Sequence, residues 1–348
     1  MATTRPPREV RFRDEQVVMA HGAGGIASRR LVEGLFAPLL FGTGSEPLSD
    51  AAQLDFNGTR IGFTTDSFVV RPLRFPGGSI GELAVNGTVN DLAVSGVRAE
   101  ALVVGYILEA GLPTPVLEAE VRAMGDAARK AGVVIVSGDT KVVEHGRADG
   151  MYITTAGIGR AIPGVRLSPQ LVRPGDQVIL SGPVGDHGIT ILLARGDLDL
   201  ESEVRSDTRP VLPFVEALVE VASPGLRWMR DPTRGGLATS LNELARDCGL
   251  CIALHEDLIP VGDAVRGACE LLGLDPLHIA NEGQFVAVLA PEFADLALDA
   301  LQRTPGGEGA ATIGEVREVP AATVLGIAPY GGTRVIDMLV GDPLPRIC

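Results

Sequence analysis

Four aspartates beside small polar residues have the character of ligands for a metal cation. Asp66 in TTDS, Asp139 in SGDT and Asp231 in RDPTRGG follow strand-like or turn segments, and Asp91 lies late in a predicted helix beside Asn90. Carboxylate oxygens suit Mg²⁺, which commonly binds through a few carboxylates together with the phosphates of a substrate. Taken singly, each aspartate has an equally ordinary interpretation as a turn or cap residue. Taken together, they favour a site for Mg²⁺ and a nucleotide.

A glycine-rich loop, HGAGG at 21–25, precedes a predicted helix that begins at Ile26. The free N–H groups of such a loop and of the first helical turn can hold a phosphate. We therefore expect Gly22, Gly24 and Gly25 to contact a nucleotide. The spacing is neither that of the P-loop nor that of the dinucleotide fingerprint, so a loop without a ligand stays the alternative.

Two further residues could take part in proton or phosphoryl transfer. Lys141 follows Asp139 closely and could stabilise a transferring phosphoryl group, although a solvated surface lysine is the alternative. Glu282 precedes a predicted strand and could act as a general base, although an ordinary turn glutamate is the alternative. Asn86 and Asn90 lie four residues apart in a helix, where they would either face a site or make hydrogen bonds between elements.

Cys348 ends the segment GDPLPRIC and carries a thiol at the tip of a proline-containing arm. Proline disfavours a helix or a central strand there, and eight extended residues reach roughly 26–29 Å. The thiol could therefore reach a site on its own chain or on a neighbouring one. A frayed end with an incidental cysteine is the alternative. Core positions are predicted for the other cysteines, Cys248, Cys251 and Cys269.

Composition limits the class of protein. A length of 348 residues suggests two domains, and the net charge of −14 makes a nucleic-acid partner improbable. No apolar run is long enough to span a membrane, and the polar stretch 1–14 lacks the apolar segment of a secretory signal. The four cysteines are not spaced as a disulfide or zinc framework, which predicts a cytoplasmic location.

Alternating strand and helix signals predict an α/β (α+β) fold. Strands are expected at 60–65, 101–108, 133–136, 151–158, 177–180, 251–254 and 285–289. Helices are expected at 79–95, 114–131, 235–248 and 263–272. Pro115 and Gly132 mark the ends of the second helix, and one apolar face of the third carries Leu237, Leu241, Leu244, Ala245 and Cys248. Ser79 and Glu82 have the spacing of a capping box, and the strand at 133–136 is expected to be buried. A Pro- and Gly-rich linker at 160–174 divides the chain into domains 1–165 and 166–335, followed by a flexible tail, 336–348.

The motifs together resemble one family. They are HGAGG (21–25), TTDSFVV (64–70), PGGSIGELAVNGTVNDLAVSG (76–96), SGDTKVVEHG (137–146), SGPVGDHGI (181–189), DPTRGGLATSLNE (231–243), NEGQF (281–285) and PRIC (345–348). The chain closely resembles the HypE hydrogenase maturation proteins, the carbamoyl dehydratases, apart from about its first dozen residues. The pattern TTDS…ND…GDT is shared with aminoimidazole ribonucleotide synthetase, selenophosphate synthetase and thiamine-monophosphate kinase, whereas the PRIC ending is typical of HypE.

This resemblance implies two α/β domains of the aminoimidazole ribonucleotide synthetase type and a homodimer formed by the N-terminal domains. It implies ATP and Mg²⁺ between the N-terminal sheet and the glycine-rich loop. The implied nucleotide-binding residues are Gly22, Gly24, Gly25, Thr65, Asp66, Asn90, Asp91, Asp139, Thr140 and Asp231. The implied metal ligands are Asp66, Asp91, Asp139 and Asp231, and the implied catalytic residues are Cys348, Glu282 and Lys141.

The resemblance also implies a reaction sequence. The carbamoyltransferase HypF would load a carbamoyl group onto Cys348, and this protein would dehydrate it to a thiocyanate at the expense of ATP. The cyano group would pass to iron on a HypC–HypD scaffold complex during assembly of the [NiFe]-hydrogenase centre. An amide oxygen leaves poorly unless it is phosphorylated, and the residues above supply metal ligands, a cation, a base and a mobile thiol for that chemistry.

The sequence departs from the selenophosphate synthetase pattern in two places, and two alternative functions stay open. The segment 71–74 lacks the further acidic residue of selenophosphate synthetases, and the reactive cysteine or selenocysteine near their N-terminus is absent. Another ATP-dependent kinase or synthetase of the same superfamily, acting on a small molecule, is the first alternative. A non-enzymatic metal carrier that holds iron or nickel through Cys348 is the second.

Overall fold

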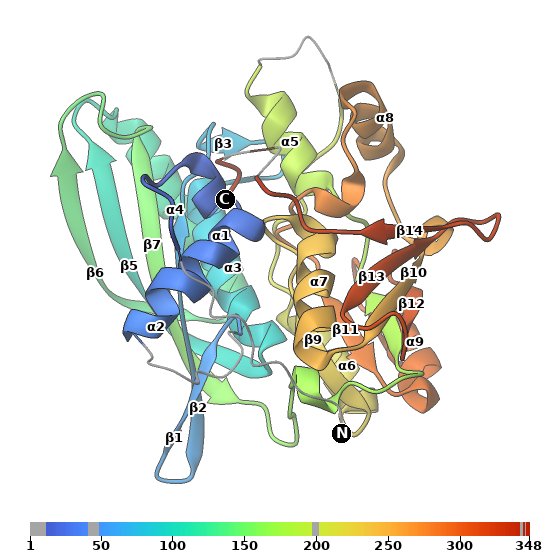
Figure 1. The fold of residues 1–348 in the computed structure, drawn as a ribbon. Helices are drawn as coiled ribbons and strands as arrows, with labels where there is room; N and C mark the ends of the chain where they lie inside the picture. Colours follow the sequence, from blue (N-terminus) through green and yellow to red (C-terminus); the bar gives the residue numbers. More distant parts are fainter. Residues whose placement is uncertain (1–11, 41–48, 197–201, 342–343, 345) are drawn as a thin grey trace.

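The computed structural model describes residues 12–40, 49–196, 202–341, 344 and 346–348. The first eleven residues of the stretch predicted to lack a signal, and tail residues 342, 343 and 345, lie outside the described residues. Figure 1 shows two sheets on opposite sides of the molecule, with helices α1, α3 and α7 between them. Within the described residues, no helix combines the length and apolar character needed to cross a membrane.

The N-terminal part is built on a mixed sheet with strand order β1-β2-β7-β5-β6. Its strands are β1 (Ala52–Phe56), β2 (Thr59–Phe68), β5 (Val97–Glu109), β6 (Val134–Val143) and β7 (Met151–Ala161). Only β5 and β6 pair in parallel among these neighbours. Helices α3 (Ile80–Val94) and α4 (Thr114–Ala131) pack on each other, and α3 lies against β2, β5 and β7. A short hairpin, β3 (Arg74–Phe75) and β4 (Gly78–Ser79), precedes α3.

The C-terminal part is built on a larger sheet with strand order β14-β13-β10-β12-β8-β11-β9. Its strands are β8 (Gln177–Leu180), β9 (Leu226–Arg230), β10 (Cys251–His255), β11 (Val286–Leu289), β12 (Ala311–Arg317), β13 (Thr323–Ile327) and β14 (Thr333–Ile336). Its helices are α5 (Asp186–Ala194), α6 (Leu212–Ala222), α7 (Gly236–Cys248), α8 (Asp263–Leu272) and α9 (Ala294–Arg303). Helix α7 shares one apolar cluster with the sheet, and α6 and α9 share another.

A helical segment near the N-terminus contacts the C-terminal part. It consists of a 3₁₀ turn (Met19–Gly22), α1 (Ile26–Leu31), a π-helical turn (Val32–Phe36) and α2 (Ala37–Leu40). The N–H of Ile26 donates to the carbonyl of Leu339 over 2.9 Å, and a guanidinium nitrogen of Arg234 donates to the carbonyl of Gly22 over 3.0 Å. The glycine-rich loop is therefore held against the C-terminal part.

The helix predictions with clear end signals are confirmed. Helices α4 and α8 have the predicted bounds, and α7 begins one residue later than predicted. Gly132, which follows α4, adopts φ 71°, a left-handed conformation that glycine tolerates without steric cost. The buried face predicted for α7 is also present, with Leu237, Leu241 and Leu244 in the core.

Three local predictions are wrong. Ser79 precedes α3 but its side chain makes no capping hydrogen bond. The strand expected to be buried at 133–136 begins at Val134 and is β6, an exposed edge strand that continues to Val143, whereas Val133 before it is buried as predicted. Asp139 therefore lies inside this strand, and Asp66 likewise lies inside β2 rather than after its end. The pleat of β2, rather than a loop, sets the direction of the Asp66 side chain.

Candidate active site

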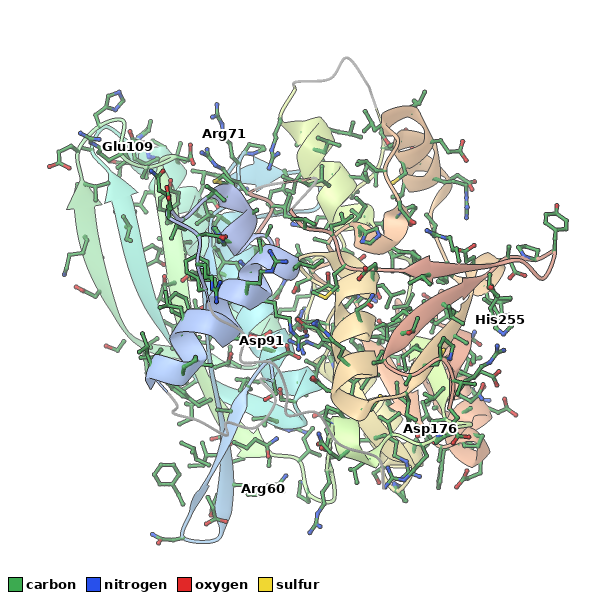
Figure 2. The ribbon with its side chains drawn as sticks, viewed as in Figure 1. Arg60, Arg71, Asp91, Glu109, Asp176 and His255 are labelled. Atoms are coloured by element: carbon green, nitrogen blue, oxygen red, sulfur yellow. The ribbon has the colours of Figure 1, made fainter. Side chains whose placement is uncertain are left out.

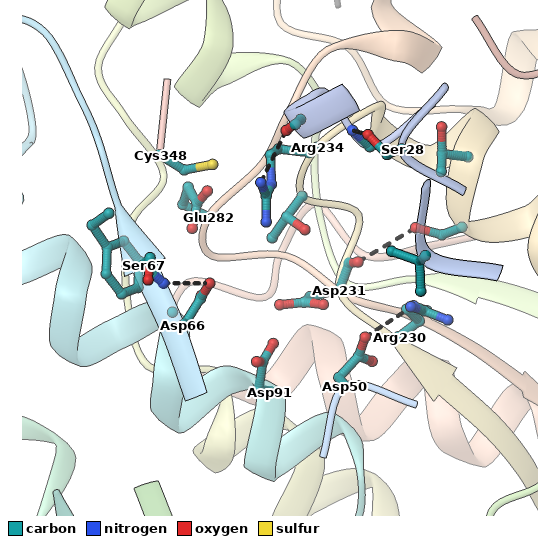
Figure 3. A pocket seen from close by; sticks show the side chains of 18 of the residues that line it. Ser28, Asp50, Asp66, Ser67, Asp91, Arg230, Asp231, Arg234, Glu282 and Cys348 are labelled. Atoms are coloured by element: carbon teal, nitrogen blue, oxygen red, sulfur yellow. Dashed lines mark hydrogen bonds and ion pairs between the residues drawn. The ribbon is translucent and has the colours of Figure 1, made fainter. Parts of the chain in front are cut away.

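A cavity of about 370 Å³ lies where the two parts meet. Helix α3, strand β2 and the glycine-rich loop form its N-terminal side, and the loop after β9, helix α7 and Glu282 form its C-terminal side (Figure 3). The lining includes eight predicted site residues, namely Gly22, Gly24, Thr65, Asp66, Asp91, Asp231, Glu282 and Cys348. Figure 2 shows Asp91 at the centre of the molecule, between the two sheets.

Three carboxylates meet in this cavity at the spacing of a cation site. One oxygen from each of Asp50, Asp91 and Asp231 lies within 4.8 Å of the others. Asp66 extends from β2 toward the same group, as Figure 3 shows. The structure thus brings together three of the four predicted aspartates and adds Asp50.

The carboxylates destabilise one another when no cation is bound. Burial, followed by the neighbouring charges of Asp231, Asp50 and Asp66, raises the pKa of Asp91 well above its ordinary value. Burial and the charge of Asp50 likewise raise the pKa of Asp231 well above the ordinary range. Clustered oxygens with excess negative charge are the donor set that Mg²⁺ prefers, so the residues present fit this ion.

One arginine partly neutralises the negative charge of the carboxylate cluster. Arg230 Nε lies 3.0 Å from Asp50 Oδ1, and its Nη1 lies 3.1 Å from Glu243 Oε2. These contacts come from the end of β9, directly before Asp231. Since Arg230 is shared between Asp50 and Glu243, it does not neutralise all the carboxylates of the cavity.

We expect Asp91→Asn to stabilise the metal-free protein while it weakens binding of Mg²⁺ and ATP. Below the ordinary aspartate pKa, Asp91 is neutral in the folded and unfolded states, so the variant should equal the wild type in acid. As the pH rises from the ordinary aspartate pKa toward the raised pKa, the unfolded wild type ionises while the folded state keeps its proton, so the wild type loses stability that the variant keeps. At neutral pH the variant should therefore unfold at a higher denaturant concentration than the wild type, measured by chemical unfolding in the presence of a chelator.

Calorimetry with Mg²⁺ and ATP supplies the second measurement for Asp91→Asn, and binding should weaken because one anionic oxygen ligand is lost. Asp126→Asn is the matched control, since this exposed aspartate pairs with Arg129 on the surface of α4. Unchanged stability and unchanged nucleotide affinity in Asp91→Asn would contradict a cation site at Asp91.

Glu282 has the environment of a general base. Its side chain is buried in the cavity, and no described residue makes a hydrogen bond to its Oε1. Burial, then the charges of Asp66, Asp231 and Asp207, raises its pKa well above the ordinary value. A carboxylate that lacks a partner and binds a proton readily can accept one from a substrate.

The backbone around Glu282 is fixed by the chain itself. The N–H of Glu282 donates to Asp207 Oδ1 over 3.1 Å, and the N–H of Gly283 donates to Asp207 Oδ2 over 3.0 Å. Asn90 Nδ2 donates to the carbonyl of Glu282 over 3.2 Å. These bonds hold the Glu282 backbone in place and leave its carboxylate free to face the cavity.

The two helix asparagines join the two parts of the molecule. Asn90 Nδ2 also donates to the carbonyl of Arg209 over 2.9 Å, and Asn90 Oδ1 accepts from the N–H of Val211 over 2.8 Å. Asn86 Nδ2 donates to Thr208 Oγ1 over 3.1 Å. Both asparagines therefore make hydrogen bonds between elements, and Asn90 does not line the cavity.

The end of the chain docks into this same cavity. The backbone oxygen of Cys348 accepts from the N–H of Val69 over 2.9 Å, and Leu344 and Ile347 are buried. Figure 3 shows the Cys348 side chain beside Glu282. The described part of the tail therefore reaches the cavity of its own chain rather than extending freely.

The remaining predicted residues lie elsewhere. Asp139, Thr140 and Lys141 are exposed on β6, where Lys141 Nζ lies 2.7 Å from Asp139 Oδ2 and lowers the pKa of Asp139. Gly25 precedes α1 without lining the cavity, and the N–H of Gly24 already donates to Ser28 Oγ. A phosphate-binding role for the loop, and the roles of these β6 residues, stay predictions.

Sequence reasoning missed several lining residues. Asp50 precedes β1 in a segment with no recognisable motif, so no signal could have identified it. Arg230 and Arg234 flank the DPT motif and were within reach of motif analysis, because two cations beside an aspartate suggest an anionic ligand.

Comparison with known proteins places these features in one family. Residues 48–161 match the family described as AIR synthase related protein, N-terminal domain, and residues 173–326 match its C-terminal domain. The chain is 48% identical over 337 residues to carbamoyl dehydratase HypE of Azotobacter vinelandii, with 97% of this chain and 98% of the relative covered.

Two solved structures are similar over most of their length. One, a HypE–HypF complex, aligns with a TM-score of 0.83 and 40% identity, covering 89% of this chain and 99% of the other. The other, the hydrogenase maturation protein HypE in complex with ATP, aligns with a TM-score of 0.79 and 45% identity, covering 96% of this chain and all of the other. The chain belongs to the HypE family of carbamoyl dehydratases, the hydrogenase maturation proteins built from the two AIR synthase related domains.

Proposed function

We propose that this chain uses ATP to dehydrate a carbamoyl group carried on the thiol of Cys348, giving a thiocyanate. The observation that carries this proposal is the position of Cys348 in one cavity with Glu282 and the aspartates. A substrate held on that thiol would lie beside a base and beside a site suited to a metal-bound phosphate. The product would supply a cyanide ligand for the iron of a [NiFe]-hydrogenase.

The reaction balances in two steps. The carbamoyl oxygen attacks the γ-phosphorus of ATP, ADP leaves, and the nitrogen loses one proton, which gives an O-phosphorylated imidate on sulfur. The C–O bond then breaks with its electron pair on phosphate, and loss of the second N–H proton closes the C≡N bond. One oxygen and two protons thus leave the carbamoyl group, and neither carbon nor sulfur is oxidised.

The described residues divide this work. Asp50, Asp66, Asp91 and Asp231 would hold Mg²⁺. When bound, the ion would neutralise part of the negative charge on the phosphates of ATP. Glu282 takes the N–H proton that is lost in the second step, since its carboxylate lies next to Cys348 and has a raised pKa. Arg234, which lines the cavity, offers a second cation for the phosphates.

Lys141 can act in this reaction only from a neighbouring subunit. It lies on exposed β6, outside the cavity of its own chain, so its proposed stabilisation of the phosphoryl group requires a homodimer. On the edge strand β6, the exposed fractions of Val134, Val136 and Val142 are 59%, 61% and 67%. An apolar edge of this kind favours pairing with a second chain, which supports a homodimer through the N-terminal sheets.

Val136→Lys is expected to shift the protein toward monomers and to lower dehydration at least tenfold, because a charge would be buried in the proposed interface. Light scattering after size exclusion measures the mass in solution. Val335→Lys is the matched control, since Val335 is exposed by 63% on β14, an edge strand of the other sheet. A dimeric and fully active Val136→Lys protein would contradict the interface.

HypF is proposed as the partner that loads Cys348, because a relative of this chain forms a HypE–HypF complex. A HypC–HypD scaffold is proposed as the acceptor of the cyano group, and the expected location is the cytoplasm. Release of phosphate from ATP tests the function directly. We expect slow release from the unloaded protein and a burst, one phosphate per loaded thiol, after carbamoylation. If the loaded and the unloaded protein hydrolyse ATP at the same rate, the result would favour a small-molecule kinase instead.

A further inference from the structure

A buried histidine holds the tail one residue before Cys348. His187, near the start of α5, is fully buried, and its Nε2 lies 2.6 Å from the carbonyl oxygen of Ile347. Because a carbonyl only accepts, Nε2 must carry the proton of this hydrogen bond. The ring of Phe75 lies edge-on to the imidazole, with 5.6 Å between the two ring centroids.

The second ring nitrogen has a partner that suits this tautomer. His187 Nδ1 lies 2.8 Å from Ser206 Oγ, so a neutral ring accepts the serine hydroxyl there and donates from Nε2. Ser206 Oγ in turn accepts from the N–H of Thr208 over 3.2 Å. Burial lowers the pKa of His187 to about 4, so the ring is neutral at physiological pH.

The segment that holds His187 also holds the Glu282 loop. Asp207, between Ser206 and Thr208, accepts from the N–H groups of Glu282 and Gly283. The N–H of Ser206 donates to the carbonyl of Pro76, which ties the segment to the hairpin before α3. One short stretch of chain therefore contacts both the tail, through His187, and the proposed base, through Asp207.

We propose that His187 is a positioning residue that sets Cys348 against Glu282, by joining the Ile347 carbonyl to the Ser206–Thr208 segment. The role in catalysis rests on the proposed function, whereas the docking of the tail does not. A partner enzyme cannot enter a cavity of about 370 Å³, so the thiol must leave it for loading and return for dehydration. The histidine therefore acts on the return, when the loaded thiol must regain a reactive position.

The first test measures how firmly the tail docks and does not depend on enzymatic activity. His187→Ala should raise the rate at which iodoacetamide alkylates Cys348 by roughly tenfold, since one buried hydrogen bond is lost. His187→Gln, whose amide can donate in place of Nε2, should restore most of the protection. His255→Ala is the matched control, because His255 ends β10 and lies well away from Asp91 in Figure 2. Peptide mass mapping identifies the labelled cysteine.

The buried thiols of Cys251 and Cys269 report folding in the same experiment. If they become labelled in His187→Ala, the variant is unfolding, and Ser206→Ala then takes its place, because it keeps the imidazole and removes the partner of Nδ1 together with the acceptor of the Thr208 N–H. Unchanged labelling of Cys348 in a folded His187→Ala protein, or in Ser206→Ala where the first variant unfolds, would overturn the proposal.

The second test separates loading from dehydration. Loading of His187→Ala by the carbamoyltransferase should equal or exceed that of the wild type, while its ATP-dependent dehydration should fall roughly tenfold, with an unchanged KM for ATP. A general structural defect would lower both reactions. If the wild type itself shows no ATP-dependent dehydration, the proposed function fails, yet the alkylation result still decides whether His187 docks the tail.

Discussion

Cys348→Ala should accept no carbamoyl group and should make no thiocyanate, although it should fold and bind ATP normally. The variant removes the atom that carries the substrate and leaves intact the backbone contacts of the tail with Val69 and His187. Activity should therefore fall to the detection limit. Intact-mass measurement after incubation with the carbamoyltransferase checks the loading, and calorimetry checks ATP binding.

The other cysteines provide the matched control for Cys348→Ala. Cys248 is half-buried at the end of α7, so Cys248→Ser should lose some stability and keep its chemistry. Loading of Cys348→Ala, or a carbamoyl adduct mapped to Cys248, Cys251 or Cys269, would show that the tail is not the substrate carrier.

Glu282→Gln should slow thiocyanate formation by on the order of 10²–10⁴-fold, the usual contribution of a positioned base. The glutamine keeps the shape and the backbone bonds to Asp207 and Asn90 but cannot take the proton. Wild-type activity should rise with pH as Glu282 ionises through its raised pKa, and the variant should lose this rise. Single-turnover assays that follow ADP and the nitrile separately measure the two steps.

We expect Glu282→Gln to form ADP while it accumulates the phosphorylated intermediate. Glu256→Gln is the control, since Glu256 pairs with Arg334 at the edge of the C-terminal sheet, away from the cavity. Thiocyanate formation at nearly the wild-type rate in Glu282→Gln would place the base elsewhere.

The architecture could be predicted where local signals were complete. Pro115 near the start and Gly132 after the end delimit α4, and apolar spacing identified the buried face of α7. The exposure of β6 could not be predicted. An apolar strand read from sequence has the same pattern whether its own chain or a second chain covers it, and here the described chain leaves it open.

The site was predictable through its motifs and only partly through its geometry. Asp66, Asp91 and Asp231 lie in recognisable motifs and meet in the cavity, whereas Asp50 lies in none and is brought there by the pairing of β1 with β2. The role of Asn90 depends on which segment packs against α3, and that contact joins residues more than a hundred positions apart. Such long-range contacts leave no local pattern.

The measurement that tests the central claim most directly is the intact mass of the protein after loading by the carbamoyltransferase, recorded before and after ATP and Mg²⁺ are added. The loaded protein should carry one carbamoyl group, mapped to Cys348, and should lose the mass of one water only when ATP is present. A carbamoyl adduct that persists with ATP, or that loses water without it, would contradict ATP-dependent dehydration on this thiol.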